Sequence, residues 1–218
     1  MNPILEKAPG AVLIVALLLL AGCAGKVEYV RPSAGGNGTN SIEIEGARDA
    51  IWNRAVPKLG KQFFVINNLD KSSGLINVSY SGDPEQYVDC GRVKSHVKNA
   101  AGERNYDFPA AKAQQSYEVL EPGLGLFHID RKMSLEGRIN LIFEEIGPKQ
   151  TRVTANTRYI LTRQSNTKNV GSGAIGTNSD TISFNSSSGA GFPANSKGMV
   201  VECVSTGKLE SDLLNTVR

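Results

Sequence analysis

The stretch MSLEGRINLIF, residues 133–143, alternates apolar and polar side chains, with Gly137 in one of the apolar positions. After Gly147 and Pro148 the alternation resumes in RVTANTRYIL, residues 152–161. A period of two places every second side chain on the same face of a strand. The two stretches therefore predict a long antiparallel hairpin with one buried face and one face in water.

Other elements extend outward from this hairpin. Apolar residues recur at helical spacing between Ile51 and Leu59, and again between Leu209 and Val217. Two β-rich runs, 63–69 and 75–80, flank a polar turn and predict a second hairpin. Further strands are expected at Ser41–Glu45, 87–97, 114–120 and 198–204. This order predicts an α+β fold, in which an antiparallel sheet carries two helices on one face.

The first residues have the features of an export signal. Residues 11–21 are uniformly apolar, Lys7 precedes them, and Leu20-Ala21-Gly22-Cys23 follows. Eleven apolar residues are too few to span a bilayer, which takes about 20. The Leu-Ala-Gly-Cys stretch resembles the lipobox of bacterial lipoproteins. An ordinary signal peptide with a chance cysteine, or a short buried helix, is the alternative.

The resemblance to lipoproteins implies a cellular location. Residues 1–22 would be the signal peptide, and Cys23 would receive the acyl chains of a permanent membrane anchor. Ala24 stands where an Asp would favour the inner membrane, so the resemblance implies the outer membrane, with the protein facing the periplasm.

The remaining chain divides into a tether and one domain. Residues 23–41 contain little to bury and predict a flexible tether, which leaves 42–218 as a single periplasmic α+β domain. Within that domain, 21 of the 33 residues at 164–196 are Ser, Gly, Asn or Thr, so most of this segment is expected to be a mobile loop.

Two cysteines remain once Cys23 is set aside. Cys90 and Cys203 follow similar strand-like sequences, and an even pair in an oxidising compartment suggests a disulfide. The alternative is two buried free thiols.

The chain has no recognisable catalytic or nucleotide-binding motif. It lacks a phosphate-binding loop, a nucleophile elbow and a His-Glu-x-x-His sequence, and its formal net charge of +3 is too small for a dedicated nucleic-acid binder. His96 and His128 are isolated, and they are expected to be surface residues rather than catalytic bases. We therefore expect a protein that is not an enzyme, with no metal and no cofactor.

Two clusters of charged residues are likewise expected to be solvated surface groups. An acidic group lacks the spacing of a calcium loop and is expected to lie in solvated turns: Asp83, Glu85 and Asp89. A modest basic group is expected to face solvent, with contact to lipid A or peptidoglycan as the alternative: Arg92, Lys94, Lys98 and Arg104.

The segment 42–80 also resembles a known family. The resemblance rests on Ala50-Ile51-Trp52, Leu59, Phe64-Val65-Ile66, the turn at 70–74, and Leu75-Ile76. These resemble the helix-grip modules of BamC-type (NlpB-like) outer-membrane lipoproteins. The resemblance implies a helix-grip fold.

Two functions are compatible with this sequence. The first is an accessory or scaffold in envelope protein assembly, held to the membrane by its lipid and in contact with other envelope proteins but not with nucleic acid. The alternative is a binding module for a lipid, a glycan or another small ligand. Such a module would hold its ligand between helix and sheet, in a pocket lined by Trp52, Phe64 and Tyr159.

Overall fold

A long hairpin runs through the whole molecule. The computed structural model describes residues 24–33, 39–195 and 198–218. These residues form the strands β1 (Ala24–Val30), β2 (Ser41–Glu45), β3 (Val65–Asp70), β4 (Leu75–Gly82), β5 (Val88–Asp89), β6 (Arg92–Asn99), β7 (Gly102–Pro109), β8 (Gln114–Glu121), β9 (Gly125–Gly147), β10 (Gln150–Asn169), β11 (Ile175–Asn185), β12 (Gly189–Gly191) and β13 (Glu202–Ser205), and the helices α1 (Arg48–Leu59) and α2 (Lys208–Val217). β9 and β10 pair along their length, with Phe143 opposite Val153 and Leu135 opposite Leu161, which confirms the predicted hairpin.

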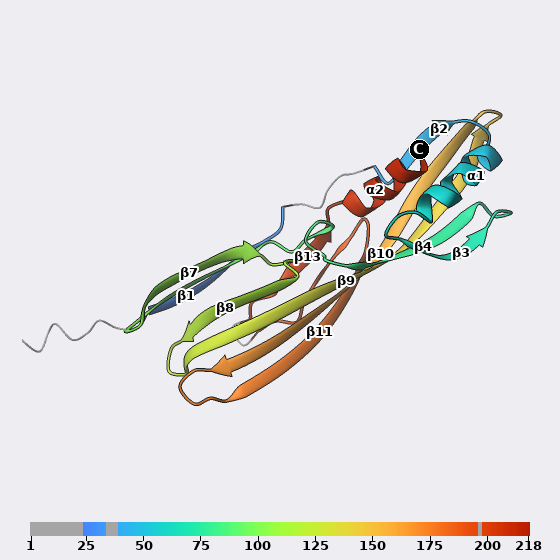
Figure 1. Ribbon diagram of the computed structural model, residues 1–218. Helices are drawn as coiled ribbons and strands as arrows, with labels where there is room; N and C mark the ends of the chain where they lie inside the picture. The colour runs from blue at the N-terminus through green and yellow to red at the C-terminus, as the bar shows by residue number, and fades with distance from the viewer. Residues whose placement is uncertain (1–23, 34–38, 196–197) are drawn as a thin grey trace, which may run out of the picture.

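The hairpin has different neighbours at its two ends, and the result is an elongated body (Figure 1). Near the β9–β10 turn, β9 pairs with β4 and β10 pairs with β2, while β3 lies outside β4. Toward the other end, β9 pairs with β8 and β10 pairs with β11. All seven strands belong to one antiparallel sheet.

The two helices cover one face of this sheet near the β9–β10 turn. Trp52 on α1 packs edge-on against Phe143 on β9, with ring centroids 5.2 Å apart. Leu209 on α2 packs over Gly137, where an added Cβ would lie 2.9 Å from its Cδ2 atom. A side chain at position 137 would therefore displace the end of the Leu209 side chain.

The far half of the molecule contains only strands. A three-stranded sheet, β1–β6–β7, lies against β8, and a small sheet, β12–β13–β5, lies between the two halves. Tyr29 on β1 fastens the first sheet to the small one, since its hydroxyl donates to the carbonyl oxygen of Glu202 at 3.0 Å and accepts from the Glu202 amide at 2.9 Å.

The predicted α+β helix-grip fold is therefore wrong. Over the part of the chain that the structure describes, 60% of residues are in strands and 12% in helices, arranged in three sheets. The helices and the central hairpin form where their periodicity predicts them, but segments expected to be tether or loop also form strands.

Two segments that were expected to be tether and loop account for part of the difference, and β7 is a further strand that the sequence did not predict. Ala24–Val30, expected to be tether, is β1 and pairs with β6. The segment 164–196, expected to be a mobile loop, mostly continues β10 and forms β11, with the Thr162 and Thr181 hydroxyls 3.1 Å apart across the two strands. Threonine favours strands, and backbone pairing does not require an apolar side chain. Composition alone therefore misassigned both segments.

Candidate functional site

The expected disulfide is present. Cys90 and Cys203 are joined with an S–S distance of 2.05 Å, and both residues are fully buried. The bond links the chain just after β5 to β13, across 113 residues of sequence. The other predicted site residue, Cys23, lies outside the described residues, which resume at Ala24 in β1.

The residues expected to line a pocket between helix and sheet belong to the packed core instead. Trp52 contacts Phe143, and Phe64 packs against the same core. Tyr159 is fully buried, and its ring stacks on Phe184 with the centroids 5.2 Å apart. None of the three predicted residues lines the cavity described below.

The carboxylate of Glu210 on α2 is buried, and no pattern in the sequence predicted its contacts. The hydroxyl of Tyr159 donates to Glu210 at 2.7 Å from Oε2, and Ser186 donates to the same carboxylate at 2.7 Å. Burial raises the pKa of Tyr159, and the negative charge of Glu210 raises it further. Glu210 is 51 residues from Tyr159, so no local pattern relates them. The cluster is enclosed and fastens α2 to β10.

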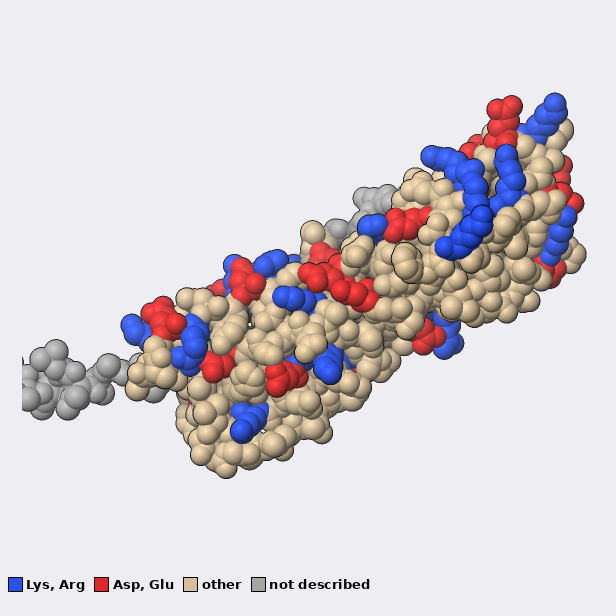
Figure 2. All heavy atoms as spheres, in the orientation of Figure 1, with Lys and Arg blue, Asp and Glu red and all other residues tan. Residues whose placement is uncertain are grey.

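The basic and acidic surface groups are intermixed. Figure 2 shows blue and red side chains side by side over this face. In the predicted basic group, Arg92 pairs with Asp107 at 2.9 Å, and Arg104 forms an ion pair with Glu118. Two acids of the predicted turn cluster accept hydrogen bonds from backbone amides: Asp83 from Glu85 at 2.8 Å and Asp89 from Gly91 at 2.7 Å. Within the described ranges, no three His, Cys, Asp or Glu residues form a group that could hold a metal ion.

The histidines lie on strands. His96 on β6 is 2.9 Å from Glu103, and this contact lowers the pKa of the glutamate. His128 on β9 is 3.4 Å from Asp130. Each histidine thus has a surface carboxylate beside it.

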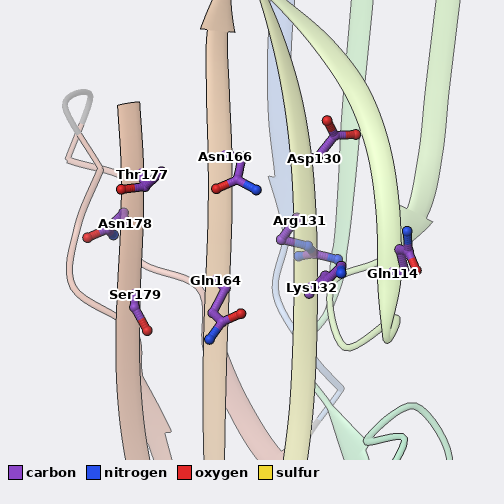
Figure 3. Close-up of a pocket in the computed structure, with 9 residues that line it drawn as sticks. All are labelled: Gln114, Asp130, Arg131, Lys132, Gln164, Asn166, Thr177, Asn178 and Ser179. Carbon is purple, nitrogen blue, oxygen red and sulfur yellow. The ribbon is translucent and has the colours of Figure 1, made fainter. Parts of the chain in front are cut away.

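A shallow hollow lies on the outer face of β9, β10 and β11. Its volume is about 270 Å³, and all nine residues lining it are polar or charged. Asp130, Asn166 and Thr177 form one row of side chains across the three strands (Figure 3). Every side chain that lines this hollow carries a hydrogen-bonding group.

A mostly apolar cavity lies between the β1–β6–β7 sheet and the inner face of the long sheet. Its volume is about 390 Å³, within the range of small-molecule sites. Strands β1, β6, β8, β9, β10 and β11 all contribute to the wall, as does the segment before β13. The apolar part of the wall includes Val27, Val93, Val119, Phe127, Ile129 and Val201.

Two arginines and two acidic residues interrupt this apolar wall: Arg131, Arg163, Asp180 and Glu121. Arg163 on β10 donates to Asp180 on β11 at 2.7 Å and lies over the ring of Phe192, 4.4 Å from its centroid. Arg131 on β9 is 5% exposed, and no carboxylate within the described residues forms an ion pair with it.

Arg131 is incompletely satisfied. Its Nη2 makes one long hydrogen bond of 3.5 Å to the carbonyl oxygen of Pro109, and its guanidinium lies 5.2 Å from the centroid of the Phe108 ring. Its Nε is buried without a hydrogen-bond partner in the described structure. Burial lowers the pKa of this guanidinium, and the neighbouring charge of Arg163 lowers it further.

The sequence did contain a signal for Arg131. Phe127, Ile129, Arg131, Met133 and Leu135 continue the inward-facing alternation of β9. The predicted hairpin began at Met133 and so stopped short of the charged residue at an inward position. A charge at such a position is uncommon unless it is paired or has a function.

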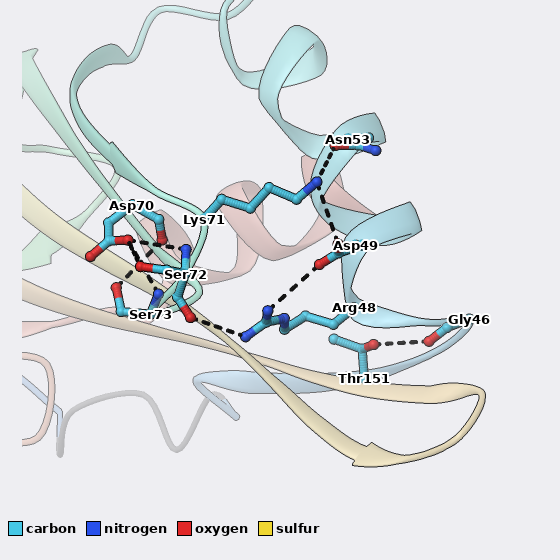
Figure 4. A network of polar contacts seen from close by, with 9 residues as sticks. All are labelled: Gly46, Arg48, Asp49, Asn53, Asp70, Lys71, Ser72, Ser73 and Thr151. Carbon is cyan, nitrogen blue, oxygen red and sulfur yellow. Dashed lines mark hydrogen bonds and ion pairs between the residues drawn. The ribbon is translucent and has the colours of Figure 1, made fainter.

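A polar cluster at the opposite end fastens the β3–β4 turn to α1 (Figure 4). Asp70 accepts hydrogen bonds from the hydroxyl of Ser72 at 2.6 Å and from the amide of Ser73 at 3.2 Å. The hydroxyl of Ser72, followed by Ser73, lowers the pKa of Asp70 to about 2. Lys71 reaches Asp49 on α1 at 3.5 Å. These contacts stabilise the β3–β4 turn and attach it to α1, so we assign the cluster a structural role.

The fold and the cavity together describe a mostly β protein with an internal apolar site that contains a buried cation. No protein-family model, no curated protein and no solved structure matches the chain. Among the residues that the structure describes, no helix is long and apolar enough to cross a membrane.

Proposed function

We propose that this protein is a lipid-anchored envelope lipoprotein that binds, without catalysing a reaction, an elongated apolar molecule in the cavity between the β1–β6–β7 sheet and the long sheet. The single observation that carries the proposal is the cavity of about 390 Å³. Its wall combines aliphatic and aromatic side chains with a few polar groups, which is the usual composition of a small-molecule site.

The cavity follows the direction of the strands. Phe127 and Arg131 both line it, and four residues of extended strand separate them by roughly 13 Å. A flexible chain lying along β9 would place its carbon atoms against the apolar side chains. Each methylene removed from water contributes about 0.8 kcal/mol. An alkyl chain therefore suits the cavity better than a glycan does.

Exposed apolar residues at one end of the molecule favour the proposal of a membrane anchor. Leu124, Val170 and Ile175 lie in or beside the β8–β9 and β10–β11 turns, and each is more than half exposed. Asn169 donates to the carbonyl oxygen of Leu124 at 2.9 Å, which holds the two turns together as one apolar tip. Exposed apolar groups gathered at one place are typical of contact with a membrane or a partner.

The chain enters the described structure next to this tip. Gly25 in β1 approaches Leu120 so closely that an added Cβ would lie 2.6 Å from the leucine Cβ. A bilayer that holds the proposed anchor would therefore also contact the apolar tip. Leu124 belongs to both the tip and the cavity wall, which gives a ligand a short route from the membrane.

Photoaffinity labelling tests the binding proposal. The full chain is reconstituted in phosphatidylcholine vesicles, a photoreactive long-chain alcohol is added, and labelled peptides are identified by mass spectrometry. We expect labels on β8 and β9, and a large loss of labelling in Val119→Trp, which fills the cavity. Leu69→Trp, on β3 outside the cavity, is the matched control and is expected to label normally. Labelling that ignores Val119→Trp would contradict the proposal.

A scaffold for envelope proteins is the second candidate function. It is favoured by β3, an edge strand that carries the exposed apolar residues Val65 and Leu69 and follows Phe63, which is 90% exposed. An edge of this kind can accept a strand from a partner. A photocrosslinking amino acid at Phe63 should capture specific envelope proteins in intact cells, whereas one at Lys149 should not. Equal capture from both positions would count against this role.

A further inference from the structure

We propose that Arg131 binds the acidic head group of the ligand in the cavity, so that the ligand is an anionic amphiphile: an alkyl chain that ends in a carboxylate or a phosphate. This inference rests on the proposed function. It adds the chemical class of the ligand and the residue that selects it.

The first argument is the unmet hydrogen-bonding capacity of Arg131. A guanidinium has five N–H donors and no acceptor. Here the described residues offer one oxygen, the carbonyl of Pro109 at 3.5 Å, which is at the long limit of a hydrogen bond. The Nε–H donor has no partner in the described part of the chain, although almost all buried polar groups in folded proteins are satisfied.

The second argument is the charge of the cavity. Asp180 neutralises Arg163 at 2.7 Å, and Arg131 lies on the adjacent strand, opposite Ser165. Glu121 also lines the cavity, but it is opposite Gly125, six residues and roughly 20 Å along β9 from Arg131. The inner end of the cavity therefore carries one positive charge that no described carboxylate balances.

The third argument is energetic. Burying a guanidinium without an anion is costly, and both burial and Arg163 oppose its charge, as the lowered pKa of Arg131 indicates. The ring of Phe108 at 5.2 Å offsets only part of this cost. A carboxylate or phosphate oxygen at Arg131 would supply both the missing acceptor and the missing charge, and guanidinium binds both groups in a two-pronged geometry.

The apolar wall and the cation are arranged in sequence along β9. Phe127 and Ile129 line the cavity before Arg131 is reached, and all three side chains point to the same face. A molecule whose head group is at Arg131 would extend its chain past Ile129 and Phe127 toward the apolar tip. This order matches an amphiphile whose head group is buried and whose tail points to the entrance.

Competition experiments separate the head groups. The photoreactive alcohol labels the full chain in phosphatidylcholine vesicles, and unlabelled hexadecanol, hexadecanoic acid and hexadecyl phosphate compete at equal mole fractions in the lipid. We expect one or both acidic competitors to be more effective than hexadecanol by about tenfold or more. The better of the two acids shows whether the source of the charge is a carboxylate or a phosphate.

Substitutions assign the preference to one residue. In Arg131→Met the three competitors should become equal while alcohol labelling continues, and Arg131→Lys, which keeps the charge, should retain part of the preference. Arg138→Met removes an exposed arginine from the outer face of the same strand and should change nothing. Thermal unfolding of each variant verifies that it is folded.

The two proposals fail in different ways. If no probe labels the cavity, the proposed function fails. If the alcohol labels the cavity but the unmodified protein shows no preference for an acid, or if the preference persists in Arg131→Met, the function stands and the role of Arg131 is overturned.

Discussion

Replacing both Cys90 and Cys203 by alanine should destabilise the protein by an amount that follows from the position of the disulfide in the chain. The cross-link closes a loop of 113 residues. For a loop of this length, the loss of chain entropy in the unfolded state corresponds to about 4.8 kcal/mol, and removal of a native disulfide typically costs about 2–5 kcal/mol. A loss of about 4.8 kcal/mol should lower the melting temperature of a domain this large by roughly 10 to 20 °C.

Urea unfolding followed by circular dichroism measures the effect. The unmodified protein is compared with the double alanine variant and with the unmodified protein after reduction, which retains both sulfur atoms. We expect the reduced protein to lose most of the stability that the variant loses, because the cross-link rather than side-chain packing is the main contribution. A loss below about 1 kcal/mol on reduction would refute the entropic reasoning.

Three further predictions concern the polar clusters and the apolar tip. Glu210→Ala leaves the buried hydroxyl of Tyr159 without its acceptor, and urea unfolding should show a loss of about 3 kcal/mol; an effect below a third of that would contradict the network. Asp70 should titrate at about 2 by NMR, so its contribution to stability is complete above its unfolded pKa of 3.8 and is lost as the pH falls toward 2. Ser72→Ala should return this pKa toward 3.8, and an ordinary pKa in the unmodified protein would disprove the assignment. In Ile175→Trp the fluorescence of the new tryptophan should be blue-shifted and quenched by brominated lipids, whereas that of Phe63→Trp at the opposite end should not be quenched. Equal quenching of the two variants would contradict membrane contact at the apolar tip.

The central hairpin could be predicted from the sequence because its physical cause is local. From Met133 to Phe143 the inward positions are apolar or glycine and the outward positions are polar except Ile142, so the sequence indicates which face of the strand is buried. The disulfide was predictable for a different reason: once Cys23 is assigned to the anchor, only two cysteines remain to pair.

The segments that were missed have long-range causes. Residues 164–181 are mostly polar, and only Ile182 and Phe184 near the end of β11 are buried apolar residues, so most of these two strand segments forms because β10 and β11 satisfy each other's backbone groups. Ala24–Val30 becomes a strand because β6, far along the chain, offers an edge to pair with. Neither partner can be identified from the composition of the segment itself.

The candidate site lies between these two cases. Arg131 occupies an inward position of a pattern that was partly recognised, so extending the alternation by one residue pair would have identified it. That Asp180 pairs with Arg163 and leaves Arg131 unbalanced could not be predicted, because it depends on a strand that was expected to be a loop.

The length of β9 has a mechanical consequence. Its 23 residues form one uninterrupted strand of roughly 75 Å, paired on both sides and joined to both halves of the body. β1 begins one residue after Cys23. If Cys23 is held at a bilayer surface, the β-strands would act as a stiff spacer between the bilayer and the helices. The helices and the exposed edge of β3 would then stand at a nearly constant height above the lipid, which a flexible linker of the same number of residues could not maintain.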